Sequence, residues 1–474
     1  MSRETITRGV VEALDEAPLG RFHFRVLLTA GMGFFTDAYD LFIIGVALAL
    51  IKVEYHPSAI LIGLIGSTAL IAALVGATVF GRIADVFGRK AVYGLEAAIM
   101  AVAAIGSALS PNLEWLIVWR FVLGIGIGGD YPVSAVIMSE YSNRKNRGRL
   151  VSMVFSMQAL GLVMGPVVAL VILALGINHD IAWRLMLGLG AIPAIAVIYL
   201  RRRLPESPRY MARVQGKASA AAEAVRTYTH NQVDVQGEAG GERVRLSLRQ
   251  FLSSPRYLLL LVGTGGSWFM LDYTFYGNSI SSPLILKSLA PGASLIEDTA
   301  ITLVIFAVCA LPGYVVAFFT IDRIGHRRLQ FVGFSMMAVA FFVIGVIPGV
   351  IKDVAPFLIL YGLSYFFTEF GPNTTTFVLP AELYPVAART TGHGISAGTG
   401  KLGAFVGTFT FPLVLATLGL SGVMLIAAST AVIGIGATFL LPEPSGQTLE
   451  MASQEDRLVP EPALEAAGAL SRSG

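Results

Sequence analysis

Long apolar stretches alternate with short charged segments from residue 26 to residue 441 of the chain. Each stretch is close to the ~20 residues that an α-helix needs to cross the hydrocarbon core of a bilayer. Their approximate bounds are 26–51, 60–81, 91–110, 115–139, 150–175, 184–201, 257–289, 300–321, 329–350, 355–380, 392–417 and 420–441. The pattern predicts an all-α integral membrane protein with twelve transmembrane helices.

Composition supports this fold class. Of 474 residues, 55% are hydrophobic and 14% are charged, and the mean hydropathy is +0.70. Charges run throughout residues 1–22, so we expect a cytoplasmic segment there and no cleaved secretory signal. The single cysteine, Cys309, lies in an apolar stretch, where we expect it to be a small buried hydrophobe. We expect no cofactor and no metal site.

Basic residues concentrate in alternate loops, within residues 82–90, 144–149 and 323–328. Short cytoplasmic loops accumulate Lys and Arg, so the pattern predicts that both termini are cytoplasmic. We interpret these clusters as topology signals in a multi-pass protein of the cell membrane, and we expect no nucleic-acid binding.

A polar interval divides the apolar stretches into two groups of six. The expected organisation is an N-terminal cytoplasmic segment (1–22), a first half (23–203), a cytoplasmic linker with short helices (204–256), a second half (257–441) and a cytoplasmic tail (442–474). Short motifs recur across the linker: DVFGRK at Asp85 and DRIGHR at Asp322, and LPES at Glu206 and LPEP at Glu443, are both 237 residues apart. Transporters are often built from repeated halves with the binding site between them.

Acidic and basic residues also recur at the loop ends of the two halves. Glu140 precedes Arg147 by seven residues, and Glu382 precedes Arg389 by seven. A carboxylate and a guanidinium of one half can pair at such places and separate when helices tilt. We therefore predict conformational latches, rather than plain solvated end charges, formed by Asp85, Arg89, Glu140, Arg147, Asp322, Glu382 and Arg389.

The twelve stretches, DVFGRK, PESPRY after the sixth stretch and PEPSGQTLE after the twelfth together resemble the major facilitator superfamily over nearly the whole chain. This resemblance implies two pseudo-symmetric six-helix halves.

Eight acidic or basic residues lie inside the predicted spans, away from their ends. An ionisable group at membrane depth costs at least ~2.5–3.5 kcal/mol, so it usually faces a cavity and serves a substrate or an ion. The eight are Asp37, Asp40, Glu96, Arg120, Asp130, Asp272, Glu369 and Lys401. Acids outnumber bases by six to two, which indicates that several acids carry protons, as a proton-coupled carrier requires.

The seventh apolar stretch contains GTGGSWFMLDYTFYGNS, which places Trp268, Asp272 and Tyr276 on one helical face at i, i+4 and i+8. We interpret this face as part of a ligand site rather than as packing aromatics. Together with further polar groups in other spans, it suits a small, multiply oxygenated anion that carries its own proton. Phosphate carries a proton at neutral pH and sulfate does not, so Asp272 is expected to favour phosphate.

Three more polar residues are candidates for the same site. In FFTEFGPNTTTF, Gly371–Pro372 is expected to interrupt the helix and expose backbone groups directly before Asn373. Gln158 lies among apolar neighbours, and Lys401 lies among small residues that let helices approach closely. In GIGIGGDYP, Gly124 and Gly128 have the spacing of a helix-packing face.

A narrower resemblance is to the phosphate:proton symporter family. Its motifs are similar to GIGIGGDYPVSAVIMSEYSNRKNRGR (124–149), FSMQALG, WFMLDYTFYG, FGPNTTTFVLPAELYP and HGISAGTGKLGA in this chain. The resemblance implies phosphate binding by Tyr131, Gln158, Trp268, Asp272, Tyr276 and Asn373, with Lys401 near the substrate. It similarly implies proton-coupling roles for Asp37, Asp40, Glu96, Asp130 and Asp272, with Arg120 as their charge partner.

The expected function is import of inorganic phosphate with protons by alternating access, in a chain that works as a monomer. Glu369 departs from the family pattern, which more often shows a neutral amide there. Sugar porters share PESPRY and WRLMLGLGAIPA, so a proton-coupled sugar or organic-anion symporter remains the alternative. A non-transporting phosphate sensor is less consistent with the many intramembrane acids. The chain shows no nucleophile–base pair and no Walker motif, so we do not expect an enzyme.

Overall fold

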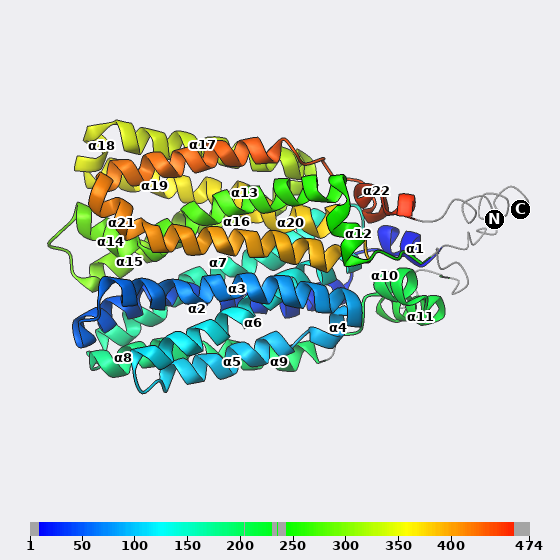
Figure 1. Ribbon diagram of the computed structural model, residues 1–474, viewed down its shortest axis with the longest axis horizontal. Helices are drawn as coiled ribbons and strands as arrows, with labels where there is room; N and C mark the ends of the chain where they lie inside the picture. Colours follow the sequence, from blue (N-terminus) through cyan, green and yellow to red (C-terminus); the bar gives the residue numbers. More distant parts are fainter. Residues whose placement is uncertain (1–8, 203, 230–234, 236–242, 459–474) are drawn as a thin grey trace, which may run out of the picture.

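The computed structural model describes residues 9–202, 204–229, 235 and 243–458, which are almost entirely helical. Figure 1 shows the helices running side by side along the long axis of the molecule. The N-terminal segment contains α1 (Val10–Glu16). The first half consists of α2 (Arg21–Tyr55), α3 (Ala59–Phe87), α4 (Arg89–Val92), α5 (Leu95–Ala108), α6 (Leu113–Tyr141), α7 (Arg147–Ala174), α8 (His179–Gly188) and α9 (Ala191–Arg201).

The linker contains the expected short helices, and the second half follows it. The linker elements are α10 (Pro208–Tyr210), the π-helical turn η1 (Met211–Gln215), α11 (Ala218–Tyr228) and α12 (Leu248–Ser253). The second half and tail contain α13 (Pro255–Ile280), α14 (Ser282–Leu289), α15 (Leu295–Ile305), η2 (Phe306–Ala310), α16 (Leu311–Ile324), α17 (His326–Val346), α18 (Pro348–Lys352), α19 (Val354–Thr368), η3 (Glu369–Asn373), α20 (Thr374–Leu383), α21 (Arg389–Thr438), α22 (Leu449–Ser453) and η4 (Glu455–Leu458).

The described residues form 11 helical spans long and apolar enough to cross a membrane. The last of them, α21, covers 50 residues and turns at Gly419, where φ is 65° and ψ is −174°. This backbone conformation favours glycine, and it separates the two apolar stretches predicted at 392–417 and 420–441. The twelve predicted membrane helices are therefore confirmed.

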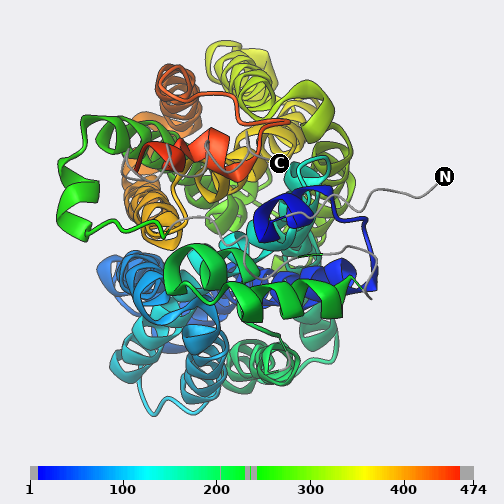
Figure 2. The same cartoon turned by 90° about the vertical axis from the view of Figure 1, so that its right-hand side faces the viewer.

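Both halves meet along the length of the bundle. Helix α3 packs against α21, and α7 packs against α15 and α16. Helices α1, α10, α11, α12 and α22 gather at one end, which we call the terminal end; we call the opposite end distal (Figure 1). Figure 2 views the terminal end and shows α10 and α11 in front of the blue-to-cyan helices of the first half.

The sequence repeat is a structural repeat. Glu206 accepts hydrogen bonds from the backbone N–H groups of residues 89 and 90, at 3.2 and 3.1 Å. Glu443 accepts the equivalent bonds from residues 326 and 327, at 2.9 and 3.0 Å. Each glutamate thus binds the start of a helix on its own half, where unpaired N–H groups favour an anion.

The glycines of GIGIGGDYP bring α6 against α3. A Cβ atom at Gly124 would lie 2.1 Å from the carbonyl oxygen of Ala69, and one at Gly128 would lie 2.0 Å from that of Ala73. Only a residue without a side chain fits at either place. This close approach fixes the segment that carries Asp130 and Tyr131.

The expected interruption near Gly371–Pro372 takes the form of the π-helical turn η3, and helix α20 continues directly after it. The widened turn leaves carbonyl groups without their usual partners. Thr374, Thr375 and Thr376 donate their hydroxyl protons to the carbonyls of residues 369, 371 and 372, at 2.7, 3.0 and 2.8 Å. The backbone groups that we expected to be exposed are therefore bonded within the helix.

Candidate functional site

The seven residues predicted to bind substrate come from five elements of the two halves. Tyr131 lies on α6, Gln158 on α7, three residues on α13, Asn373 in η3 and Lys401 on α21. None of the seven is more than 3% exposed. They lie in the interior of the bundle, away from both ends.

Lys401 is the cation of the candidate site. Its Nζ donates to Oδ2 of Asp272 at 3.0 Å and to the hydroxyl of Tyr276 at 2.9 Å. The ammonium also lies 4.6 Å from the ring centroid of Tyr131 and 4.3 Å from that of Tyr276. Since Tyr131 belongs to the first half and the others to the second, these contacts join the two halves.

Gln158 and Asn373 meet through a residue that the sequence analysis missed. The hydroxyl of Tyr314, on α16, donates to Oε1 of Gln158 at 2.7 Å and accepts from Nδ2 of Asn373 at 2.8 Å. The same Nδ2 also donates to Oε2 of Glu369. Two candidate ligands from different halves are thus held by one tyrosine and one glutamate.

Two aromatic layers enclose these polar groups. Toward the terminal end, Phe377 stacks on Phe155 with ring centroids 4.5 Å apart, and Phe34 lies 4.9 Å from Phe377. Toward the distal end, Phe42 stacks on Tyr276 at 5.6 Å and lies 5.9 Å from Phe306. Both layers join the first half to the second, so the site is closed on both sides.

The acids Glu96 and Asp130 are paired with an arginine that the sequence analysis also missed. Arg201, at the end of α9, lies 2.7 Å from Glu96 and 2.6 Å from Asp130. The hydroxyl of Ser134 donates to Asp130 at 2.6 Å. Two fully buried acids thereby share one buried cation.

The two aspartates of α2 have different surroundings. Both carboxylate oxygens of Asp37 are buried and form no hydrogen bond with a described group. Arg120, which we expected to be the charge partner, donates to the backbone carbonyl of Asp40 at 3.4 Å. Arg120 therefore lies beside one of the predicted acids, whereas Arg201 binds two others.

At the terminal end, the predicted latch residues pair across the halves. Glu140 lies 3.0 Å from Arg89 of its own half and 3.2 Å from Arg389 of the other. Glu382 lies 3.3 Å from Arg147 of the first half. The expected pairing within one half is present at Arg89. Arg389 and Arg147 instead pair with the opposite half, because α7 and α21 begin next to it.

The two latch aspartates also bind the opposite half. Asp85, at the end of α3, accepts from the backbone N–H groups of Thr390 and Thr391 at 3.3 and 2.7 Å. Asp322, at the end of α16, accepts from the backbone N–H of Arg149 at 2.9 Å. Each aspartate binds the N-terminus of a helix in the opposite half, where the helix dipole favours a negative charge.

The tail adds a further contact at this end. Arg209 lies 2.6 Å from Asp15 and 2.5 Å from Glu450 of α22. Burial alone would raise the pKa of Glu450, but Arg209 and Arg389 outweigh it and lower that pKa below its ordinary value. The same pairing raises the pKa of the Arg209 guanidinium despite its burial. These ion pairs tie the first segment, the linker and the tail together.

Two residues outside the predicted site have ordinary environments. His393, near the start of α21, lies with Nε2 3.1 Å from the carbonyl oxygen of Phe377. Cys309, expected to be buried, is half-buried in η2.

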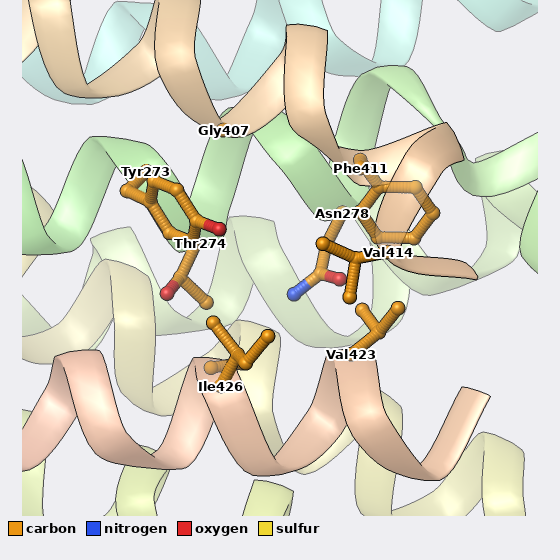
Figure 3. A pocket seen from close by; sticks show the side chains of 9 residues that line it. Tyr273, Thr274, Asn278, Gly407, Phe411, Val414, Val423 and Ile426 are labelled. Carbon is orange, nitrogen blue, oxygen red and sulfur yellow. The ribbon is translucent and has the colours of Figure 1, made fainter. Parts of the chain in front are cut away.

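A cavity of about 20 Å³ lies away from the charged groups, between α13 and the two parts of α21 (Figure 3). Tyr273, Thr274 and Asn278 line it, and it has room for about one water molecule.

Two helical halves that span the membrane around a charged interior have the architecture of transporters of the major facilitator type. The family described as "Sugar (and other) transporter" matches residues 26–455. The chain therefore belongs to this family.

Individual curated relatives show which members of this family the chain is similar to. It is 36% identical to "Inorganic phosphate transporter 1-11" of Oryza sativa subsp. japonica, over 94% of this chain and 90% of the relative. It is 38% identical to "Low affinity inorganic phosphate transporter 4" of Medicago truncatula, over 94% of both chains. These relatives confirm the resemblance to inorganic phosphate transporters.

A solved structure confirms the fold. The proton:xylose symporter XylE, bound to 6-bromo-6-deoxy-D-glucose, superposes with a TM-score of 0.76. The superposition covers 91% of this chain and 98% of the XylE chain, and the two sequences are 23% identical.

Proposed function

We propose that this protein imports inorganic phosphate together with protons, by alternating access to one site between its halves. The names and coverage of the phosphate-transporter relatives support the substrate. The observation that carries the proposal is Lys401, whose buried ammonium lies among Asp272, Tyr276 and Tyr131 where the two halves meet. A small anion bound there would contact both halves at once.

The donors and acceptors of the site suit a phosphate that still carries a proton. Its unprotonated oxygens accept from Lys401, from the hydroxyls of Tyr131 and Tyr276, from the indole N–H of Trp268 and from the amides of Gln158 and Asn373. Its P–OH group donates to Asp272, whose Oδ1 is buried and forms no hydrogen bond within the described part of the chain. Sulfate has no proton for that carboxylate, so the same contact would be repulsive.

The buried acids supply the proton route. Asp37, Asp40, Glu96 and Asp130 carry protons in the proposed cycle together with Asp272. Arg201 and Arg120 balance their charge, and both carboxylate oxygens of Asp37 are buried without a hydrogen bond to a described group. Protonation of these groups lowers the repulsion that an entering anion meets.

The latches control access from the terminal end, which faces the cytoplasm in the proposed orientation. The pairs Glu140–Arg389 and Glu382–Arg147, with Asp85, Arg89 and Asp322, hold this end closed. The basic loops of the terminal end favour this orientation. The protein works as a monomer in the cell membrane, since the site lies within one chain.

The proposal is tested by uptake of radiolabelled phosphate into proteoliposomes that contain the purified protein. Excess unlabelled phosphate is expected to abolish the labelled uptake, whereas sulfate, glucose and xylose leave it unchanged. Asp272→Asn abolishes uptake, and the matched variant Asp298→Asn, in α15, retains it. Uptake of a sugar or of sulfate in place of phosphate contradicts the assignment of the substrate.

A further inference from the structure

Glu369 is an acid of the central site to which the proposed cycle gives no role. It lies in η3, four residues before Asn373, and its side chain is 0% exposed. The titratable or polar groups that face it are Asn373 of η3, Tyr314 of α16, Asp272 of α13 and Tyr365 of α19. Its carboxyl group is therefore part of the chain of contacts that joins Gln158 and Asn373.

Among the residues that the structure describes, the groups around Glu369 include no cation. Asp272 pairs with Lys401, and Glu96 and Asp130 share Arg201, but no ion pair between described residues involves Glu369. An ionised carboxylate that is buried without a cation costs several kcal/mol, and such a group takes up a proton instead. The closed state thus favours the neutral acid at this position.

The two oxygens of Glu369 have different environments. Oε2 accepts from the amide of Asn373, whereas Oε1 is buried and forms no hydrogen bond with a described group. A proton on Oε1 creates an O–H donor beside the two amides that we expect to bind phosphate. Oε2 keeps its bond to Asn373 in either protonation state, so protonation leaves the orientation of that amide unchanged.

We propose that Glu369 is an additional proton-binding residue of the substrate site, and that it carries one proton with each phosphate. This inference rests on the proposed phosphate transport. When the site opens to the outside, Oε1 binds H⁺ from water and its O–H then donates to a phosphate oxygen. When the site opens to the cytoplasm, this O–H bond breaks, the proton passes to water and the carboxylate remains.

The charges of the site explain why the proton and the anion bind together. An entering phosphate adds negative charge beside Asp272 and Glu369, and Lys401 supplies one positive charge. A proton on Glu369 removes one of the two repulsions and adds a donor, so each ligand strengthens binding of the other. The conversion of this acid to a neutral amide removes one proton from the cycle.

The number of protons is measured from the limiting accumulation of phosphate in proteoliposomes under an imposed pH gradient, with the membrane potential clamped at zero. Each co-transported proton multiplies the limiting accumulation ratio by about ten for each pH unit. Glu369→Gln is expected to lower this ratio about tenfold per pH unit relative to the unchanged protein. The matched control Glu114→Gln, at an exposed position of α6, leaves the ratio unchanged.

Equal accumulation by the unchanged protein and by Glu369→Gln contradicts the role of Glu369 and leaves phosphate transport standing. Absence of gradient-driven accumulation in the unchanged protein contradicts the proposed function itself. Glutamine resembles the protonated acid and keeps an acceptor for Asn373, so the variant should retain phosphate–phosphate exchange without a gradient at acidic pH. Loss of exchange under those conditions also contradicts the inference.

Discussion

At the scale of single residues, the site is built around one buried cation. Lys401 has two close partners in the second half and lies over the ring of Tyr131 from the first. Removal of one member of a buried ion pair leaves an uncompensated charge, which typically costs about 3–5 kcal/mol. The stability of the protein should therefore depend on Lys401 and Asp272 together.

Lys401→Ala is expected to lower the free energy of unfolding by about 3 kcal/mol, because it leaves Asp272 buried without a cation. The double variant Lys401→Ala/Asp272→Asn should recover part of this loss, since it removes the charge as well. Denaturation of the purified variants in detergent measures both free energies of unfolding. Equal stability of the single and double variants contradicts the charge-based explanation.

Some residues of the site could be predicted from the sequence and others could not. Trp268, Asp272 and Tyr276 have a helical spacing that is visible in the chain. Tyr314 lies among apolar residues and bonds to Gln158, 156 positions away, so no local pattern reveals it. Arg201 ends an apolar stretch and resembles a topology signal, so the sequence does not distinguish it from a loop-end arginine, and its pairing with Glu96 and Asp130 is seen only in the structure.

At the scale of elements, glycines determine how closely helices pack. Gly128→Ala places a Cβ 2.0 Å from the carbonyl oxygen of Ala73, so α6 and α3 must move apart. We expect Gly128→Ala to destabilise the protein by about 1–3 kcal/mol, as overpacking of a tight interior does. Thermal unfolding in detergent measures the change.

The matched control is Gly436→Ala in α21, because a Cβ there meets no atom of the described residues within 4 Å. This variant should be neutral or slightly more stable, since alanine is the better helix former. A similar loss of stability in both variants would mean that close packing of α6 against α3 is not the cause.

Helix α22 is held at the terminal end by Glu450. Its folded-state pKa is lowered, so the carboxylate contributes stability that is present above the ordinary value of 4.5 and is lost as the pH falls through the folded-state value. A spin label at Met451, which is exposed, should become mobile as the pH falls from about 7 to about 3. In the Glu450→Gln variant, the label at Met451 should be mobile over this whole pH range.

A label at Leu252 of α12, which is also exposed, provides the control for general unfolding. Its mobility should stay constant over the range in which the label at Met451 changes. Constant mobility at both positions would contradict the role of Glu450 in docking α22.

At the scale of the whole molecule, the two repeats and the twelve helices follow from the sequence because periodicity and repetition are properties of the chain itself. The closed state does not follow from it. Conformations of one protein commonly differ by only a few kcal/mol, and one sequence encodes all of them. The pairing of latch residues across the halves was missed for the same reason, since it depends on which helix ends meet in one state.

The central claim is that proton entry drives phosphate entry through the site at Asp272 and Lys401. The most direct measurement is the accumulation of radiolabelled phosphate in proteoliposomes with an acidic exterior, compared with the same vesicles after the gradient is collapsed by a protonophore. We expect accumulation above the external concentration with the gradient, simple equilibration without it, and no uptake by Asp272→Asn. Equal uptake with and without the gradient would contradict it.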